Sequence, residues 1–290
     1  MGDLIDAMRP RQWIKNILVF AVLVFSGRLF DVYPAMLAVG AFTIFCALAS
    51  AGYLFNDFVD ASYDRTHPRK AHRPIPQGRL TPGRILSAWA LLSGAGTWGA
   101  YQLGHAFGHV CVVYVVLQVM YSVIWQHVVI VDLFALAAHY VLRVVAGSVV
   151  IGVPMSPWLV ICTVLLALFL ALSSRAQDYK ELGESAVSHR PVLAYYNPYL
   201  IDQMIAAITS AILITYTLYT ISEDTVRKFG TSLLSLTIPF VLYGIFRYLY
   251  LIHQSQGVLS IERALFTDKP MRINAMAYVA VAVLIVYVVK

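Results

Sequence analysis

Charged side chains are scarce in this chain. Asp, Glu, Lys and Arg make up only 12% of its 290 residues, whereas hydrophobic residues make up 60%. Soluble domains usually contain about 25% charged residues, so the composition excludes an ordinary soluble protein and predicts a polytopic membrane protein. A net charge of +6 would suggest nucleic-acid binding in a soluble chain. Here membrane topology and phosphate binding explain the basic residues better, and we expect no nucleic-acid partner.

Cysteine is rare too, and its pattern excludes a disulfide framework. Cys46, Cys111 and Cys162 are an odd number, and all three fall inside apolar segments. The histidines lack the spacing to Cys or carboxylates that a zinc site requires. Neither a Walker-type glycine-rich loop nor a Ser-His-Asp combination stands out. No cleavable signal peptide is expected, because Asp3 and Arg9 precede a first apolar run that continues as a membrane span.

Apolar segments long enough to cross a bilayer are the dominant feature of the sequence. They predict an all-α fold with nine transmembrane helices in one domain that covers residues 1–290. The predicted spans are 13–30, 34–57, 84–104, 108–126, 128–151, 157–174, 200–221, 231–252 and 272–289.

Lysine and arginine lie almost entirely on one side of this topology. Sixteen fall in the N-terminal segment and in the loops after the second, sixth and eighth spans, against four on the other side. Positively charged loops remain in the cytoplasm. We therefore expect a multi-pass protein of the plasma membrane whose N-terminus and active site are cytoplasmic. A soluble substrate would enter from the cytosol and a lipid substrate from the bilayer.

The end of the second span carries four oxygen-bearing side chains at helical spacing. If the helix continues through Asp64, then Asn56, Asp57, Asp60 and Asp64 lie within roughly 100° of one another. A divalent cation such as Mg²⁺ would relieve the repulsion between these carboxylates and bridge them to phosphate oxygens. A basic run follows that would take the remaining phosphate charge: Arg65, Arg69, Lys70 and Arg73. The alternative is a polar helix end followed by a solvated loop.

A second polar segment follows the sixth span. Asp178 and Glu181 are i,i+3 neighbours and would share a helical face, with Arg175 and Lys180 among them. The segment is either a second acidic cluster that faces the first across a metal and a diphosphate, or a solvated loop with local ion pairs. Arg190, slightly further on, would also reach an anion.

Other polar groups lie inside the predicted membrane region. Lys15 and Asn16 are one turn into the first span, deeper than an interfacial anchor requires, so they are candidates for substrate contact or for simple anchoring. In the fifth span, Asp132 is close enough to the cytoplasmic end to face the site. Arg143 lies about 16 Å further along, too far to pair with Asp132, and would hydrogen-bond carbonyls of a neighbouring helix.

These motifs resemble the UbiA superfamily of intramembrane prenyltransferases, across nearly the whole chain. The resemblance rests on the polar loops after the second and sixth spans. It also rests on the motif Asn56-Asp57-x-x-Asp60-x-x-x-Asp64 followed by His67-Pro68-x-Lys70-x-x-Arg73-Pro74. Within the superfamily, three further segments look like the decaprenyl-phosphate phosphoribosyltransferase branch: Arg9-Pro10-x-Gln12-Trp13-x-Lys15-Asn16, His189-Arg190-Pro191-Val192-Leu193 and the stretch from Pro239 to Arg247.

The resemblance implies a UbiA-type helical bundle and a Mg²⁺-dependent transfer of 5-phosphoribose. The donor would be phosphoribosyl diphosphate (PRPP) and the acceptor a polyprenyl phosphate, in a route to cell-wall arabinan precursors. The acceptor is already an anion, so no general base is needed. The resemblance also implies Asp57, Asp60 and Asp64 as catalytic residues. As metal ligands it implies Asn56, Asp60 and Asp64. The implied substrate-binding residues are Gln12, Lys15, Asn16, Lys70, Arg73, Tyr121, Arg175, Asp178, Lys180 and Arg190.

Two positions depart from the pattern of that branch. Arg175 stands alone where a cluster of basic residues is expected, and Gln126 stands where a lysine is expected. Either change would weaken a phosphate subsite or alter the acceptor, unless Lys180 substitutes.

Two other functions remain open. The first is a true prenyltransferase, which uses the same metal site with a polyprenyl diphosphate as the donor. The second is a transporter or lipid-binding protein. The sequence argues against this, because it shows no polar path near the middle of the membrane. The oligomeric state is also open, with a homo-oligomer as one possibility.

Overall fold

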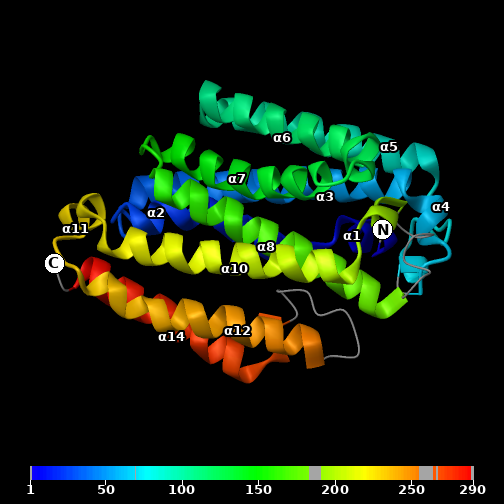
Figure 1. Ribbon diagram of the computed structural model, residues 1–290. Helices are drawn as coiled ribbons and strands as arrows, with labels where there is room; N and C mark the ends of the chain where they lie inside the picture. The colour runs from blue at the N-terminus through cyan, green and yellow to red at the C-terminus, as the bar shows by residue number, and fades with distance from the viewer. Residues whose placement is uncertain (1, 69, 183–190, 255–263, 266, 289–290) are drawn as a thin grey trace. The chain divides into compact units, whose positions relative to one another are not determined.

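The computed structural model describes residues 2–288 except 69, 183–190, 255–263 and 266. Every regular element in the described part of the chain is a helix (Figure 1). The predicted all-α class is therefore confirmed.

Seven helical segments are long and apolar enough to cross a membrane, which makes the chain a multi-pass membrane protein. Each coincides with a predicted span. They are α3 (Val32–Val59), α6 (His105–Val123), α7 (Val131–Ile151), α8 (Pro157–Leu182), α10 (Pro198–Ile221), the η6 and α12 pair (Leu233–Thr237 and Ile238–Gln254) and α14 (Lys269–Tyr287).

The two remaining predicted spans take other forms. The first is a 3₁₀-helix, η1 (Pro10–Phe20), which leads into the short α2 (Ala21–Phe25). The third is α5 (Pro82–Leu103), which is long enough to cross but has glycine, serine and threonine between its apolar residues. The prediction of nine spans is thus confirmed for seven, and for these two it remains a prediction.

The contacts divide the chain into two compact units, which we describe separately. Unit 1 comprises Met1–Met155 with Val187–Tyr195, and unit 2 comprises Ser156–Ala186 with Tyr196–Lys290. That the whole chain forms a single domain therefore stays a prediction. In unit 2, α8 packs against α10, and α12 packs against α14. The short α11 (Glu223–Phe229) follows α10, and Phe229 packs with the buried Leu234, Ile285 and Val286.

Helix α3 is central to unit 1. It packs against η1, α5, α6 and α7, and α7 in turn packs against η1. Gly147 of α7 allows that last contact, because a Cβ atom there would lie only 2.0 Å from the carbonyl oxygen of Val19 on η1. No real side chain tolerates that distance, so the position of η1 depends on this glycine.

We therefore expect Gly147→Ala to destabilise the protein and displace η1. The added methyl group would meet backbone atoms of Val19, which cannot move aside as a flexible side chain could. A loss of about 1–3 kcal/mol is typical of such overpacking. Thermal unfolding in detergent measures the change. Gly94→Ala is the matched control, since nothing lies within 4 Å of a Cβ at that helical glycine. An unchanged melting temperature for Gly147→Ala would contradict the close approach.

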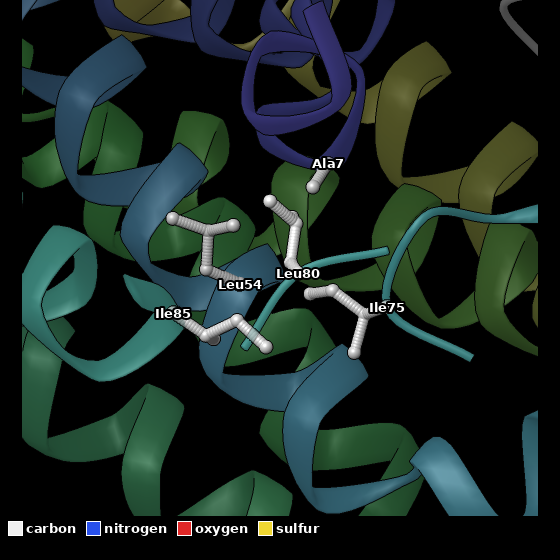
Figure 2. Packing of buried hydrophobic residues seen from close by; sticks show 5 residues of the cluster. All are labelled: Ala7, Leu54, Ile75, Leu80 and Ile85. Atoms are coloured by element: carbon white, nitrogen blue, oxygen red, sulfur yellow. The ribbon is translucent and has the colours of Figure 1, made fainter. Parts of the chain in front are cut away.

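A small apolar core holds the loop after α3 against the N-terminal helix. Ala7 of α1 (Gly2–Met8) packs with Leu54 of α3, Ile75 and Leu80 of the loop, and Ile85 of α5 (Figure 2). All five are at least 92% buried. Apolar burial of this kind stabilises the packing of the loop against α1, α3 and α5. It also fixes the segment that carries the basic residues of the predicted site.

Candidate active site

The polar residues of the motif lie where α3 ends. The helix was expected to continue through Asp64, but α3 stops at Val59, Asp60 leaves the helical conformation, and the one-turn α4 (Ala61–Asp64) follows. Helical hydrogen bonds nevertheless span the break, from the Asp60 amide to the Asn56 carbonyl and from the Asp64 amide to the Asp60 carbonyl, both 2.9 Å. The four polar side chains therefore remain close together. The prediction of one unbroken helix was wrong.

Asp57 and Asp64 are buried and paired with cations. Both are 2% exposed, and one Arg73 nitrogen, Nη1, lies 3.2 Å from an Asp57 oxygen and 3.1 Å from an Asp64 oxygen. Arg9 also pairs with Asp57, and Lys70 lies 3.1 Å from Asp64. Such pairs offset the cost of removing a carboxylate from water. Lys70 and Arg73, which were predicted to bind phosphate, thus reach the acidic cluster itself.

Two of these cations, Arg9 and Arg73, lie close enough to repel each other. Burial and the charge of Arg9 lower the pKa of Arg73, although Asp57 and Asp64 act against this. Burial also acts to lower the pKa of Arg9, but the charge and hydrogen bond of Asp57 outweigh it and the pKa is raised. Arg9 additionally lies over the ring of Tyr53, 5.1 Å from its centroid. A phosphate group that entered here would relieve the repulsion between the cations.

Asp60 differs from the other two acids because amides, not cations, contact it. Asn56 donates a hydrogen bond to Asp60 Oδ2 (3.2 Å), and Gln126 of η3 (Trp125–His127) donates one to Asp60 Oδ1 (2.9 Å). Among the described residues Asp60 has no ion pair within 4 Å. Burial raises its pKa, although the hydrogen bond from Gln126 and the charge of Lys70 partly offset this. Asp60 is therefore the carboxylate of the cluster that still lacks a cation.

The donor set at this position suits Mg²⁺ shared with a substrate. In the part of the chain that the structure describes, no three Asp, Glu, His or Cys side chains gather to hold a metal by themselves. Mg²⁺, however, usually takes one or two carboxylates and completes its shell with water and phosphate oxygens. Asp60 supplies the carboxylate. The amide nitrogen of Asn56 is used toward Asp60 and Ser122, which leaves its oxygen as a second ligand. Asp64, the third predicted ligand, is engaged by Lys70 and Arg73.

Asn16 is buried and hydrogen-bonded to residues of two other helices. It is fully buried, accepts a hydrogen bond from Arg143 Nε (2.8 Å) and donates one to Cys46 Sγ (3.4 Å). Arg143 also donates to the Tyr114 hydroxyl (2.7 Å) and to the carbonyl of His139 on its own helix (2.7 Å). The expected partners of Arg143 were carbonyls of a neighbouring helix. It instead joins η1, α6 and α7 within unit 1.

The other predicted residues of unit 1 lie on η1, α6 and α7. Gln12 and Lys15 are half-buried on η1, and Asp132 is fully buried in the first turn of α7. The ring of Tyr121 contacts that of His139, with the centroids 5.9 Å apart. Their contact with substrate remains a prediction.

The predicted residues of α8 belong to unit 2. Arg175 is 2% exposed and lies 3.9 Å from Asp178, as expected for a local ion pair. Lys180 donates to the carbonyls of Ile252 (3.2 Å) and His253 (2.6 Å) at the end of α12, where a cation stabilises the helix dipole. Whether this segment faces the first acidic cluster therefore remains a prediction. Arg69, Arg190 and the Glu181 side chain lie outside the described residues.

Sequence reasoning missed the role of Ser122 and Gln126. Gln126 stood out only as a departure from the pattern of the branch, and Ser122 did not stand out at all. Both are buried, and both contact Asn56 or Asp60. The available signal was two polar residues one helical turn apart at the end of an apolar span.

This chain is similar to known proteins in both sequence and fold. The UbiA prenyltransferase family matches residues 17–269. Decaprenyl-phosphate phosphoribosyltransferase of Corynebacterium glutamicum is 29% identical, over 98% of this chain and 87% of its own. The protein of that name from Mycolicibacterium smegmatis is 31% identical, over 77% and 72%. A UbiA homologue from Archaeoglobus fulgidus, solved with GPP and Mg²⁺ bound, aligns over 99% of this chain and 100% of its own, with a TM-score of 0.73 at 14% identity.

The structural likeness establishes the fold, and the sequence likeness establishes the relationship. The resemblance that the motifs indicated is thereby confirmed. A transporter or a non-catalytic lipid-binding protein is no longer a competing interpretation, since the matching family is one of prenyltransferases and the two relatives described above are named as phosphoribosyltransferases. This chain belongs to the UbiA prenyltransferase family and is a multi-pass membrane transferase.

Proposed function

We propose that the protein transfers 5-phosphoribose from PRPP to a polyprenyl phosphate, as a step toward cell-wall arabinan precursors. The observation that carries this proposal is the similarity to two phosphoribosyltransferases that are named for decaprenyl phosphate, over 98% and 77% of this chain. The site is compatible with it, because three cations and one cation-free carboxylate lie together. A polyanionic donor with a divalent cation would fit such a charge pattern.

In this reaction one bond forms and one breaks at C1 of the ribose. A phosphate oxygen of the lipid attacks C1, and the C1–oxygen bond to diphosphate breaks, so that diphosphate leaves with the electron pair. Asp60 and Asn56 would hold Mg²⁺, which neutralises charge on the departing diphosphate. Lys70, Arg73 and Arg9 would exchange part of their contact with Asp57 and Asp64 for phosphate oxygens. The acceptor needs no general base, since it is an anion already.

The proposed topology places this site at the cytoplasmic face of the plasma membrane. Nine spans, with the N-terminus inside, put sixteen lysines and arginines on that side and four on the other. PRPP would arrive from the cytosol and the lipid from the bilayer. That Arg175, Asp178 and Arg190 bind the substrate stays a prediction, as does a homo-oligomer.

The donor can be tested directly with the purified protein in lipid nanodiscs and Mg²⁺. One mixture contains radiolabelled PRPP with polyprenyl phosphate, and the other contains radiolabelled polyprenyl diphosphate with 4-hydroxybenzoate. We expect label to move from PRPP into the lipid fraction in the first mixture, while the second forms no labelled aromatic product. The reverse outcome would identify a prenyltransferase, the alternative that the GPP-bound homologue with the same fold favours.

A further inference from the structure

A closed set of hydrogen bonds surrounds Asp60. Gln126 Nε2 donates to Asp60 Oδ1 (2.9 Å) and to the carbonyl of Ser122 (2.6 Å). Asn56 Nδ2 donates to Asp60 Oδ2 (3.2 Å) and to the Ser122 hydroxyl (3.4 Å). Each oxygen of the carboxylate therefore accepts one amide hydrogen bond, and Ser122 anchors both amides. The set joins the end of α3 to the end of α6.

The chemistry of this arrangement differs from that of the neighbouring acids. Arg9, Lys70 and Arg73 neutralise Asp57 and Asp64. Two amides fix the orientation of Asp60 without cancelling its charge, because an amide carries no net charge. A lysine at position 126 would instead bring an ammonium group to the carboxylate and compete with a divalent cation. Gln126 is only 6% exposed, so little room remains for another role at the surface.

We propose that Gln126 is a positioning residue that orients the Asp60 carboxylate toward the divalent cation and leaves its negative charge available. The proposal rests on the metal role that the proposed function gives to Asp60. It does not depend on which donor the enzyme uses, since a PRPP enzyme and a prenyltransferase would both need that cation. Residues that orient a metal ligand typically change metal affinity about 10–100-fold when they are replaced.

The test is the binding of Mn²⁺, alone and without substrate, to the purified full-length protein, followed by electron paramagnetic resonance. Gln126→Met keeps the length of the side chain but donates no hydrogen bond. We expect its Kd for Mn²⁺ to rise about 10–100-fold. In turnover assays the Mg²⁺ concentration for half-maximal rate should rise in parallel, while kcat at saturating Mg²⁺ recovers. Gln126→Leu serves as a second variant, and thermal unfolding checks that each protein is folded.

Gln118→Met is the matched control. Gln118 lies on α6, one helical turn before Ser122. It is buried to a similar extent and also donates to α3, but its partner is the backbone carbonyl of Leu48 (3.3 Å). Its replacement should leave the Kd for Mn²⁺ unchanged. Unaltered Mn²⁺ binding by folded Gln126→Met, with or without a higher KM for the donor, would overturn the positioning role. If the unmodified protein binds Mn²⁺ but does not transfer phosphoribose from PRPP, that result would count only against the proposed function.

Discussion

Replacing Asp60 with asparagine should reduce turnover by about a thousandfold, which corresponds to about 4 kcal/mol. Asparagine has nearly the same shape as aspartate and can still accept the hydrogen bond from Gln126. What it lacks is the negative charge, and among the described residues no cation pairs with Asp60, in contrast to Asp57 and Asp64. Divalent-cation binding should therefore be lost along with activity. Radiolabel transfer and Mn²⁺ binding are measured on the same preparation.

Asp31→Asn is the control for this experiment. Asp31 precedes the same helix, α3, but it is exposed and lies at the opposite end, about 40 Å from Asp60 at 1.5 Å per residue. Its replacement removes one acid from the same element and should change neither activity nor Mn²⁺ binding. Chelation of divalent cations with EDTA should inactivate the unmodified enzyme to the same extent as Asp60→Asn. Full Mn²⁺ binding by Asp60→Asn would rule out Asp60 as a ligand.

The acidic cluster could be predicted from sequence because it is local. Asn56, Asp60 and Asp64 follow one another at helical spacing, and backbone hydrogen bonds keep that spacing even though α3 ends at Val59. The apolar segments were equally visible, since length and hydropathy suffice to recognise a span. What the pattern does not encode is the exact end of a helix, because a single residue can leave the helical conformation without changing the hydropathy.

The partners of the cluster could not be predicted, because they come from distant parts of the chain. Arg9 reaches Asp57 across 48 positions, and Gln126 reaches Asp60 across 66. Asn16 and Arg143 are separated by 127 positions and looked unrelated in the sequence. Such contacts depend on how helices pack, and periodicity carries no information about that. For the same reason the sequence did not show that Asn16 hydrogen-bonds to the buried Arg143.

The helix type of the first predicted span could not be predicted from the sequence either. An apolar run of that length predicts a span, yet Pro10–Phe20 is a 3₁₀-helix. Tertiary contacts explain how this less favourable form persists. Asn16 is held by Arg143, and the backbone at Val19 lies against Gly147. Both contacts come from α7, so the conformation of η1 is set by a helix more than a hundred residues away.

Replacing Arg73 with methionine should have opposite effects on the donor and on the metal. Among the described residues, Arg73 is the one that pairs with both Asp57 and Asp64. Without it a phosphate group loses a cation, so kcat/KM for PRPP should fall about a hundredfold, as expected for the loss of a charge-assisted contact worth about 3 kcal/mol. The same change removes a positive charge beside the acidic cluster. Mn²⁺ should therefore bind more tightly than in the unmodified protein, not more weakly.

This opposition separates a phosphate-binding role from a structural one. If Arg73 only held Asp57 and Asp64 in place, its loss would disorder the cluster, and metal binding and donor use would fall together. Arg84→Met is the control, since Arg84 is exposed at the start of α5 and its loss removes a positive charge nearby without touching either acid. It should leave kcat/KM unchanged. Weaker Mn²⁺ binding by a folded Arg73→Met protein would show that Arg73 organises the metal site, and the donor phosphate would then need another cation, with Lys70 and Arg9 as the remaining candidates in the cluster.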